Sequence, residues 1–236
     1  MNRSRAVTEM LLIFLAFFLP GYLAQALGSS PGPATTIVLL QSILTGLPQL
    51  LLLAYVAGVT GPFASPEWGC APLESRDALR VALLVAGCFA IIAPFAALSS
   101  VLPREWTSAL GAGYRWGLRS AAQIPLALVF CLTAGYREEL FFRAYLFGRM
   151  EGIGVQPRVA IALSALLFCL GHVYEGPLGV LLAAGLGLLF GAAYARRRNL
   201  HVIALAHGLY NFIVLIVGLF HPRALPGAFA MRIFNP

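Results

Sequence analysis

Long runs of apolar residues alternate with short polar connections along the whole chain. We predict that seven of these runs form membrane-spanning helices, because extended apolar runs in a chain with few charges are typical of transmembrane segments. The pattern therefore predicts an all-α fold, a polytopic transmembrane helix bundle of about seven to eight spans. The seven runs lie at about 9–27, 36–59, 81–101, 121–134, 159–173, 178–194 and 202–220.

Two parts of this pattern allow more than one arrangement. The run at 9–27 follows Arg3 and Arg5, and its Ala24-Gln25-Ala26 resembles the cleavage site of a signal peptide. We expect a retained span, because the apolar stretch is long for the h-region of a signal peptide. The segment 103–119 is amphipathic and rich in aromatic residues, so we expect it to lie at the membrane interface or to form a re-entrant segment.

Composition favours a membrane protein over a soluble domain. Hydrophobic residues make up 60% of the 236 residues and charged residues 11%, and the mean hydropathy is +0.84. A soluble domain has about a quarter charged residues. We expect one integrated membrane domain, made of N-terminal helices and connections (1–120), a catalytic helical core (121–220) and a short tail (221–236).

The chain is basic, with a net charge of +7 from 16 arginines, no lysine and nine acidic residues. In a soluble protein this balance would suggest nucleic acid as a partner. Here the arginines lie between apolar runs, so topology and anionic headgroups explain them better, and we expect the lipid bilayer but no nucleic acid as a partner. With the N-terminus inside, 11 arginines fall on the cytoplasmic side and five outside. We therefore predict an integral protein of a prokaryotic cytoplasmic membrane, with its N-terminus inside.

One short stretch, 136–149, places two adjacent carboxylates among arginines and large apolar side chains. Burying one ionised carboxylate costs several kcal/mol unless it is paired, and two adjacent carboxylates also repel each other. On a helix, Glu139 and Arg143 are four residues apart and share a face, so they can form an ion pair. Glu138 points roughly 100° away from Glu139. The spacing therefore allows one glutamate to be structural while the other stays free for chemistry.

Two further polar groups interrupt the last apolar spans. His172 ends the fifth span, and His207 and Asn211 share one face of the seventh. Each histidine alone is readily explained as a hydrogen-bonding residue between helices. Together with the two glutamates they form a constellation, and such groups inside a membrane mark function, so we expect a polar site buried among the C-terminal spans. Glu175, which precedes a Gly-Pro turn, is expected to be a solvated loop charge instead.

Two kinds of hydrolytic site use a carboxylate with two histidines. A glutamate can activate water for attack on an amide while His207 and Asn211 stabilise the oxyanion by hydrogen bonds. Alternatively, Glu138, His172 and His207 form a zinc site with an open position for water. No recognisable motif places a serine or cysteine beside a histidine, and the sequence has neither HExxH nor a Walker-type loop. The cofactor is therefore either none or zinc, and the residues leave this choice open.

Three ordered motifs resemble those of the CPBP family, also called Abi, the CAAX-protease and bacteriocin-processing family of intramembrane endopeptidases. The motifs are Glu138-Glu139-x-x-x-Arg143, Phe168-x-x-x-His172 and His207-x-x-x-Asn211. The resemblance covers about 134–220 and departs at Ala144, where many relatives have glycine. This departure should change packing more than chemistry.

The resemblance implies a role for each motif. Glu138 activates the water together with His172, the ion pair supports this glutamate, and the third motif binds the oxyanion. The family has been described both as zinc metalloproteases and as metal-independent glutamic proteases, so the resemblance also leaves the cofactor open. The implied catalytic set is Glu138, Glu139, Arg143, His172, His207 and Asn211.

We therefore expect an intramembrane endopeptidase that hydrolyses a peptide bond of a membrane-associated protein or peptide, with its site open to the cytoplasmic side. The alternative is a non-catalytic membrane protein of the same fold, such as an immunity factor, scaffold or transporter. The complete set of motifs argues against this alternative, because a pure binder could lose any member of the set. The sequence leaves the oligomeric state and the substrate open, since the family's substrates range from prenylated CAAX proteins to bacteriocin precursors and membrane-anchored sorting substrates. In a prokaryote the prenylated protein is the less expected of these.

Overall fold

Every secondary-structure element in the described part of the chain is a helix, which confirms the predicted all-α bundle. The computed structural model describes residues 3–26, 35–60, 69–99, 101–102 and 117–220. Most of the amphipathic segment 103–119 and the whole tail 221–236 lie outside these residues. The elements are α1 (Arg3–Ala26), α2 (Thr35–Thr60), α3 (Ser75–Ser99), η2 (Ala121–Gln123), α5 (Ile124–Glu139), the π-helix η3 (Leu140–Tyr145), α6 (Leu146–Gly152), α7 (Pro157–Leu170), η4 (Val173–Glu175), α8 (Gly176–Arg197) and α9 (Leu200–Phe220).

Several of these helices have the length and composition of membrane spans. Four of them, α2, α3, α8 and α9, are long and apolar enough to cross a membrane, and α7 is a shorter apolar helix. Large apolar side chains are exposed on α2 and α3, including Leu44 at 70% and Leu83 at 63%. Apolar surface of this extent is unfavourable in water. These faces therefore fit the hydrocarbon of a bilayer, as expected for an integral membrane protein.

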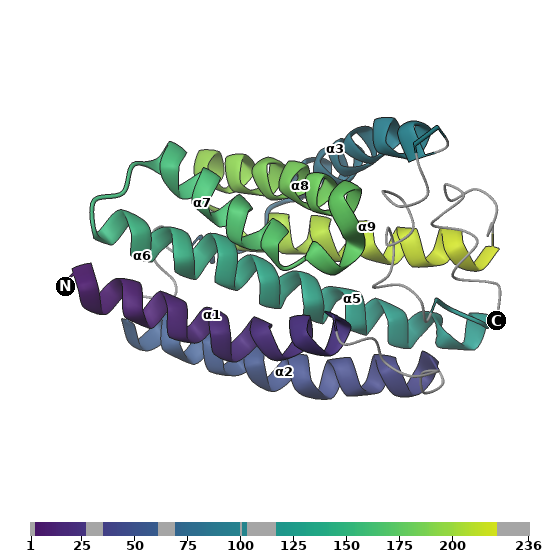
Figure 1. Ribbon diagram of the computed structural model, residues 1–236, viewed down its shortest axis with the longest axis horizontal. Coiled ribbons are helices and arrows are strands. Elements are labelled where there is room, and N and C mark those ends of the chain that lie inside the picture. Colours follow the sequence, from purple (N-terminus) through teal and green to yellow (C-terminus); the bar gives the residue numbers. More distant parts are fainter. Residues whose placement is uncertain (1–2, 27–34, 61–68, 100, 103–116, 221–236) are drawn as a thin grey trace.

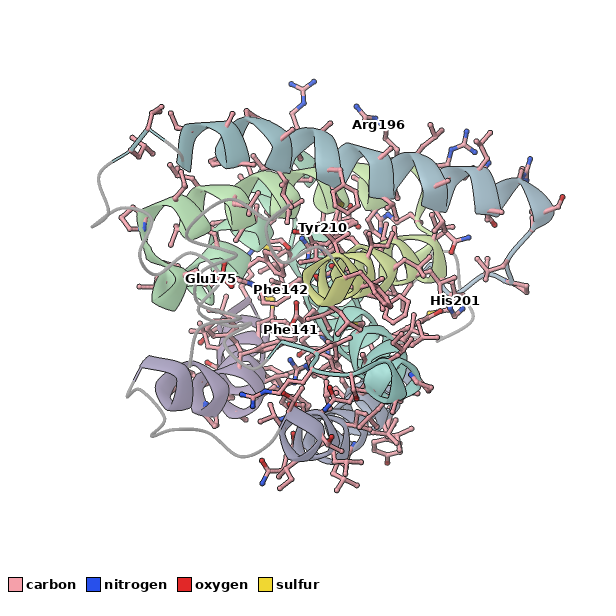
Figure 2. The ribbon with its side chains drawn as sticks, turned by 90° about the vertical axis from the view of Figure 1, so that its right-hand side faces the viewer. Phe141, Phe142, Glu175, Arg196, His201 and Tyr210 are labelled. Atoms are coloured by element: carbon pink, nitrogen blue, oxygen red, sulfur yellow. The ribbon has the colours of Figure 1, made fainter. Side chains whose placement is uncertain are left out.

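The helices run side by side along the long axis of the molecule (Figure 1). α5 packs against both α9 and α2, α7 packs against α8, and α3 packs against α8 and α9. Consequently α5 and α9 occupy the middle of the bundle, with α1 and α2 on one side and α3 and α8 on the other (Figures 1 and 2).

One continuous helical path carries the charged stretch through the middle of the bundle. α5 passes without a break into η3 and then into α6. All six residues of η3 are buried, and Figure 2 shows Phe141 and Phe142 of this segment near the centre of the bundle. A helical segment that is buried on all sides belongs in the core of a bundle. Single π-helical turns inside α-helices occur frequently at functional sites.

Two ion pairs tie helix ends together at the end of the bundle where α1 begins. Arg149 of α6 pairs with Glu9 of α1 over 2.6 Å, and Arg198, just after α8, pairs with Glu151 of α6 over 2.6 Å. The arginine count predicts that this end faces the cytoplasm, and this orientation stays a prediction. The two glutamates of the first motif lie about halfway along the continuous path of 124–152, whereas Arg149 and Glu151 lie near its end.

Candidate active site

Two glycines bring α5 and α9 into close contact next to the charged stretch. A Cβ atom on Gly135 would lie 2.8 Å from the carbonyl oxygen of Ala204 and 2.8 Å from the backbone nitrogen of Gly208. A Cβ atom on Gly208 would lie 3.0 Å from the carbonyl oxygen of Cys131. Small residues at a helix crossing let two backbones approach closely in a membrane. The crossing therefore places His207 of α9 against the glutamates at the end of α5.

We expect Gly135→Ala to destabilise the bundle, because the added methyl group would meet backbone atoms that cannot rotate away. Overpacking of this kind typically costs about 1–3 kcal/mol. Gly152→Ala is the matched control, since a Cβ atom on Gly152 would have no atom within 4 Å. Thermal melting of both variants in detergent checks the expectation. Equal melting temperatures would show that the crossing tolerates the methyl group.

Glu139 is completely buried and accepts two hydrogen bonds at one oxygen atom. Arg143 donates from Nη1 to Oε1 over 3.1 Å, and His207 donates from Nδ1 to the same oxygen over 2.7 Å. Because a carboxylate only accepts, the second bond places a proton on Nδ1 of His207. The other oxygen, Oε2, has no hydrogen-bond partner within the described residues. The expected ion pair is present, and a histidine joins it as a third member.

Arg143 is the largest fully buried side chain in the described part of the chain. Its guanidinium also donates from Nη2 to the carbonyl oxygen of Gly187 on α8 over 3.1 Å. Its Cζ atom lies 4.8, 5.7 and 5.8 Å from the ring centres of Phe168, Phe142 and Phe190. Guanidinium groups interact favourably with aromatic faces. Arg143 therefore joins η3 to both α7 and α8, and it fixes the ion pair in the core.

Glu138 differs from Glu139 because it is partly exposed. Its side chain is 20% exposed, whereas that of Glu139 is 0% exposed. Oε2 of Glu138 lies 3.8 Å from Nε2 of His207, and Oε1 lies 3.3 Å from Nη2 of Arg137. The two glutamates thus approach the two nitrogens of a single imidazole ring. Glu138 is the carboxylate of this pair that a water molecule can reach.

His172 and Asn211 are the two remaining members of the predicted set. His172 follows α7, and its Nδ1–H donates to the carbonyl oxygen of Phe168 over 2.9 Å, with the two ring centres 4.8 Å apart. With the proton on Nδ1, Nε2 of a neutral ring carries the lone pair. His172 is close enough to interact electrostatically with the Glu138 carboxylate. Asn211 is half-buried and lies one turn after His207 on α9.

The prediction that Glu175 is a solvated loop charge is wrong. The residue is only 9% exposed, and its Oε2 lies 3.0 Å from the position that a Cβ atom on Gly179 would take. Gly176, with a φ of +77°, turns the chain directly into α8. This turn folds the carboxylate against the first turn of α8 instead of leaving it in a loop.

Arg137 contacts the site directly and Gln49 contacts it through Arg137, although the sequence pattern predicted no role for either residue. Arg137 donates to Oε1 of Gln49 on α2 over 3.2 Å as well as to Glu138. Gln49 in turn donates from Nε2 to the carbonyl oxygen of Phe17 on α1 over 3.4 Å. The available signal was the amide of Gln49 inside an apolar span, because polar groups within a membrane are costly and mark function.

The ligand geometry of the site bears on the zinc alternative. In the part of the chain that the structure describes, no three His, Cys, Asp or Glu side chains are grouped so that they could hold a metal ion. Glu138, His172 and His207 are all among these residues. Nδ1 of His207 is engaged by Glu139 and Nδ1 of His172 by a carbonyl oxygen, so Nε2 is the atom of each ring that could face a metal. As arranged here, the three side chains do not fit the tetrahedral ligand set that zinc takes.

The motifs and their geometry agree with one known family. The family described as Type II CAAX prenyl endopeptidase Rce1-like matches residues 120–213, a segment that includes all three motifs and excludes Gln49. A comparison with curated proteins and one with solved structures find no match to the chain. The segment 120–213, which is less than half of the chain, is therefore similar to the Rce1-like proteases of the CPBP (Abi) family.

Proposed function

We propose that this protein is an intramembrane endopeptidase that hydrolyses a peptide bond of a membrane-associated protein or peptide by means of water activated at Glu138. One observation carries the proposal. A partly exposed carboxylate lies 3.8 Å from a histidine nitrogen, inside a bundle where the neighbouring carboxylate of Glu139 is fully buried and paired. Protein interiors and membranes rarely keep such a group unless it serves chemistry.

In the proposed reaction Glu138 acts as the general base. It removes a proton from a water molecule held between its carboxylate and His172, and the water oxygen forms a bond to the carbonyl carbon of the substrate. The carbonyl oxygen becomes an oxyanion. Glu138 then delivers its proton to the nitrogen of the leaving amine as the C–N bond breaks.

His207 and Asn211 stabilise the oxyanion in this scheme. Nδ1 of His207 donates to Glu139, so Nε2 is the atom left to face the reacting group. When the ring carries a proton on both nitrogens, Nε2 donates to the oxyanion, and the Glu139 carboxylate at Nδ1 compensates the positive charge of the ring. Hydrogen-bond donors aimed at a developing oxyanion are typically worth about 10²–10³-fold in turnover.

Cleavage of defined peptides in proteoliposomes tests this function. We suggest two internally quenched probes, a farnesylated CAAX peptide and an unprenylated peptide with a transmembrane anchor, together with a comparison of membrane proteomes from cells with the wild-type protein or Glu138→Gln. The first probe is chosen because the matching family is described as a CAAX prenyl endopeptidase. Cleavage of either probe, or precursors that accumulate only with Glu138→Gln, would support the proposal and assign the substrate class.

The alternative of a non-catalytic membrane protein on the same fold gives the opposite results. Neither probe and no membrane protein would then be cleaved by the wild-type protein. Any cellular phenotype would also persist in Glu138→Gln, because binding does not need the base. Those two outcomes together would overturn the proposed function in favour of the non-catalytic alternative.

We further propose that hydrolysis does not need a metal. Glu139 is engaged by Arg143 and His207, and Glu138, His172 and His207 are not grouped so that they could hold a metal ion. Protein purified without added metal is expected to keep its activity after extended chelation and to contain less than stoichiometric zinc. Measurement of metal content by mass spectrometry and of activity before and after chelation checks this. Stoichiometric zinc, with activity lost on its removal and regained on its return, would establish a metalloprotease.

A further inference from the structure

Arg137 occupies an unusual position between the proposed base and the N-terminal helices. It precedes Glu138 directly in the chain, and adjacent residues on a helix do not normally face each other. Nevertheless its Nη2 lies 3.3 Å from Oε1 of Glu138. Its Nη1 donates to Oε1 of Gln49 on α2 over 3.2 Å, and its Cζ lies 5.6 Å from the ring centre of Phe18 on α1. The guanidinium is thus held by two helices to which it does not belong.

Gln49 is itself fixed. Its Nε2 donates to the carbonyl oxygen of Phe17 on α1 over 3.4 Å, so its Oε1 points toward Arg137. An Oε1 acceptor at this position can bind one edge of the planar guanidinium while the other edge faces the carboxylate. A chain of hydrogen bonds therefore runs from the backbone of α1 through α2 to Glu138.

We propose that Arg137, held by Gln49, is a positioning residue for Glu138, and that α1 and α2 thereby complete a site whose motifs all lie on later helices. This inference rests on the proposed function. Arg137 restrains Oε1 of Glu138 and leaves Oε2 directed at His207, 3.8 Å away. The guanidinium of Arg137 also supplies a positive charge 3.3 Å from the ionised Glu138 carboxylate. Neither residue touches the scissile bond in this scheme.

The consequence is a specific pattern of kinetic effects. Arg137→Met frees the Glu138 carboxylate to rotate, and a misplacement of about 1 Å at a reacting group can cost on the order of 10²-fold. We expect kcat to fall by about 10–100-fold, with KM changed by less than about twofold, because the substrate itself loses no contact. Arg137→Lys keeps the charge without the planar fork, so it should restore part of the lost kcat.

Gln49 should act only through Arg137. Gln49→Leu is expected to lower kcat by about tenfold in the wild-type background and to have no further effect in the Arg137→Met background. Such non-additivity is the signature of two residues that share one interaction. The experiment is this double-mutant cycle, with kcat and KM measured on whichever quenched probe the wild-type protein cleaves.

Arg149→Met is the matched control. Like Arg137, Arg149 contacts α1, because it forms an ion pair with Glu9 over 2.6 Å. It lies at the end of the bundle and not at the site. We expect this variant to lose stability and to keep its kcat, whereas Arg137→Met should lose kcat even after correction for the folded fraction. Comparable losses of kcat in both variants, or additive effects of Gln49→Leu and Arg137→Met, would reduce Arg137 to a structural residue.

The two proposals fail in different ways. A wild-type protein that cleaves neither probe and no membrane protein overturns the proposed function, and the role of Arg137 with it. A wild-type protein that cleaves a probe while Arg137→Met and Gln49→Leu cleave it equally fast overturns only the positioning role.

Discussion

Glu138→Gln is expected to lower turnover by roughly 10²–10⁴-fold, the range that a general base contributes, while the bundle melts almost as the parent does. The amide keeps the shape of the side chain and still accepts the hydrogen bond from Arg137, whose Nη2 lies 3.3 Å from Oε1. It cannot remove a proton from water. Because Glu138 is partly exposed and Arg137 also binds Gln49, loss of the charge leaves no buried group without a partner.

The matched control for Glu138→Gln is the same substitution one residue later. Glu139→Gln removes a carboxylate that both Arg143 and His207 use in the core, so it should lower the melting temperature clearly. Both variants are to be compared with the parent in one detergent, by thermal melting and by the rate of probe cleavage. Cleavage by Glu138→Gln at a substantial fraction of the parental rate would remove this residue as the base.

Arg143→Ala is expected to destabilise the protein strongly and to lower its activity as well. It leaves Glu139 charged, buried and without its cation, and breaking a buried pair in this way costs about 3–5 kcal/mol. The variant also loses the hydrogen bond to Gly187 on α8 and the contacts with the rings of Phe142, Phe168 and Phe190. Thermal melting in detergent, measured beside Glu138→Gln, checks this.

Two further variants separate charge from shape at Arg143. Arg143→Lys keeps the charge but not the planar fork, so it should melt between Arg143→Ala and the parent. The double variant Glu139→Gln, Arg143→Met removes both charges and fills most of the space. It should melt above Arg143→Ala, because no uncompensated charge remains in the core. If Arg143→Ala melts like the parent, the structural role assigned to this ion pair is wrong.

Much of this protein is determined by the sequence alone, because the properties concerned are local. Hydropathy depends on composition over about 20 residues, so the runs at 178–194 and 202–220 predict α8 and α9 within a few residues of their observed bounds. The Glu139–Arg143 ion pair follows from the four-residue spacing of one helix. The order of the three motifs likewise indicates the family without any knowledge of the fold.

Only the tertiary structure decides which groups meet across helices. The close crossing at Gly135 and Gly208 places His207 where its two nitrogens approach both glutamates, although Glu138 and Glu139 point to different faces of α5. The spacing of residues along α5 cannot show where the imidazole ring of His207 on α9 lies.

The same limit explains the two residues whose roles the sequence pattern did not predict. Glu175 is buried because a turn at Gly176 folds it onto α8. Arg137 reaches Glu138 because Gln49, 88 positions earlier, holds its guanidinium. Local pattern determines which segments become helices and which residues share a face. Contacts between residues far apart in the chain depend on how the helices pack, and here that packing decides which carboxylate stays accessible for chemistry.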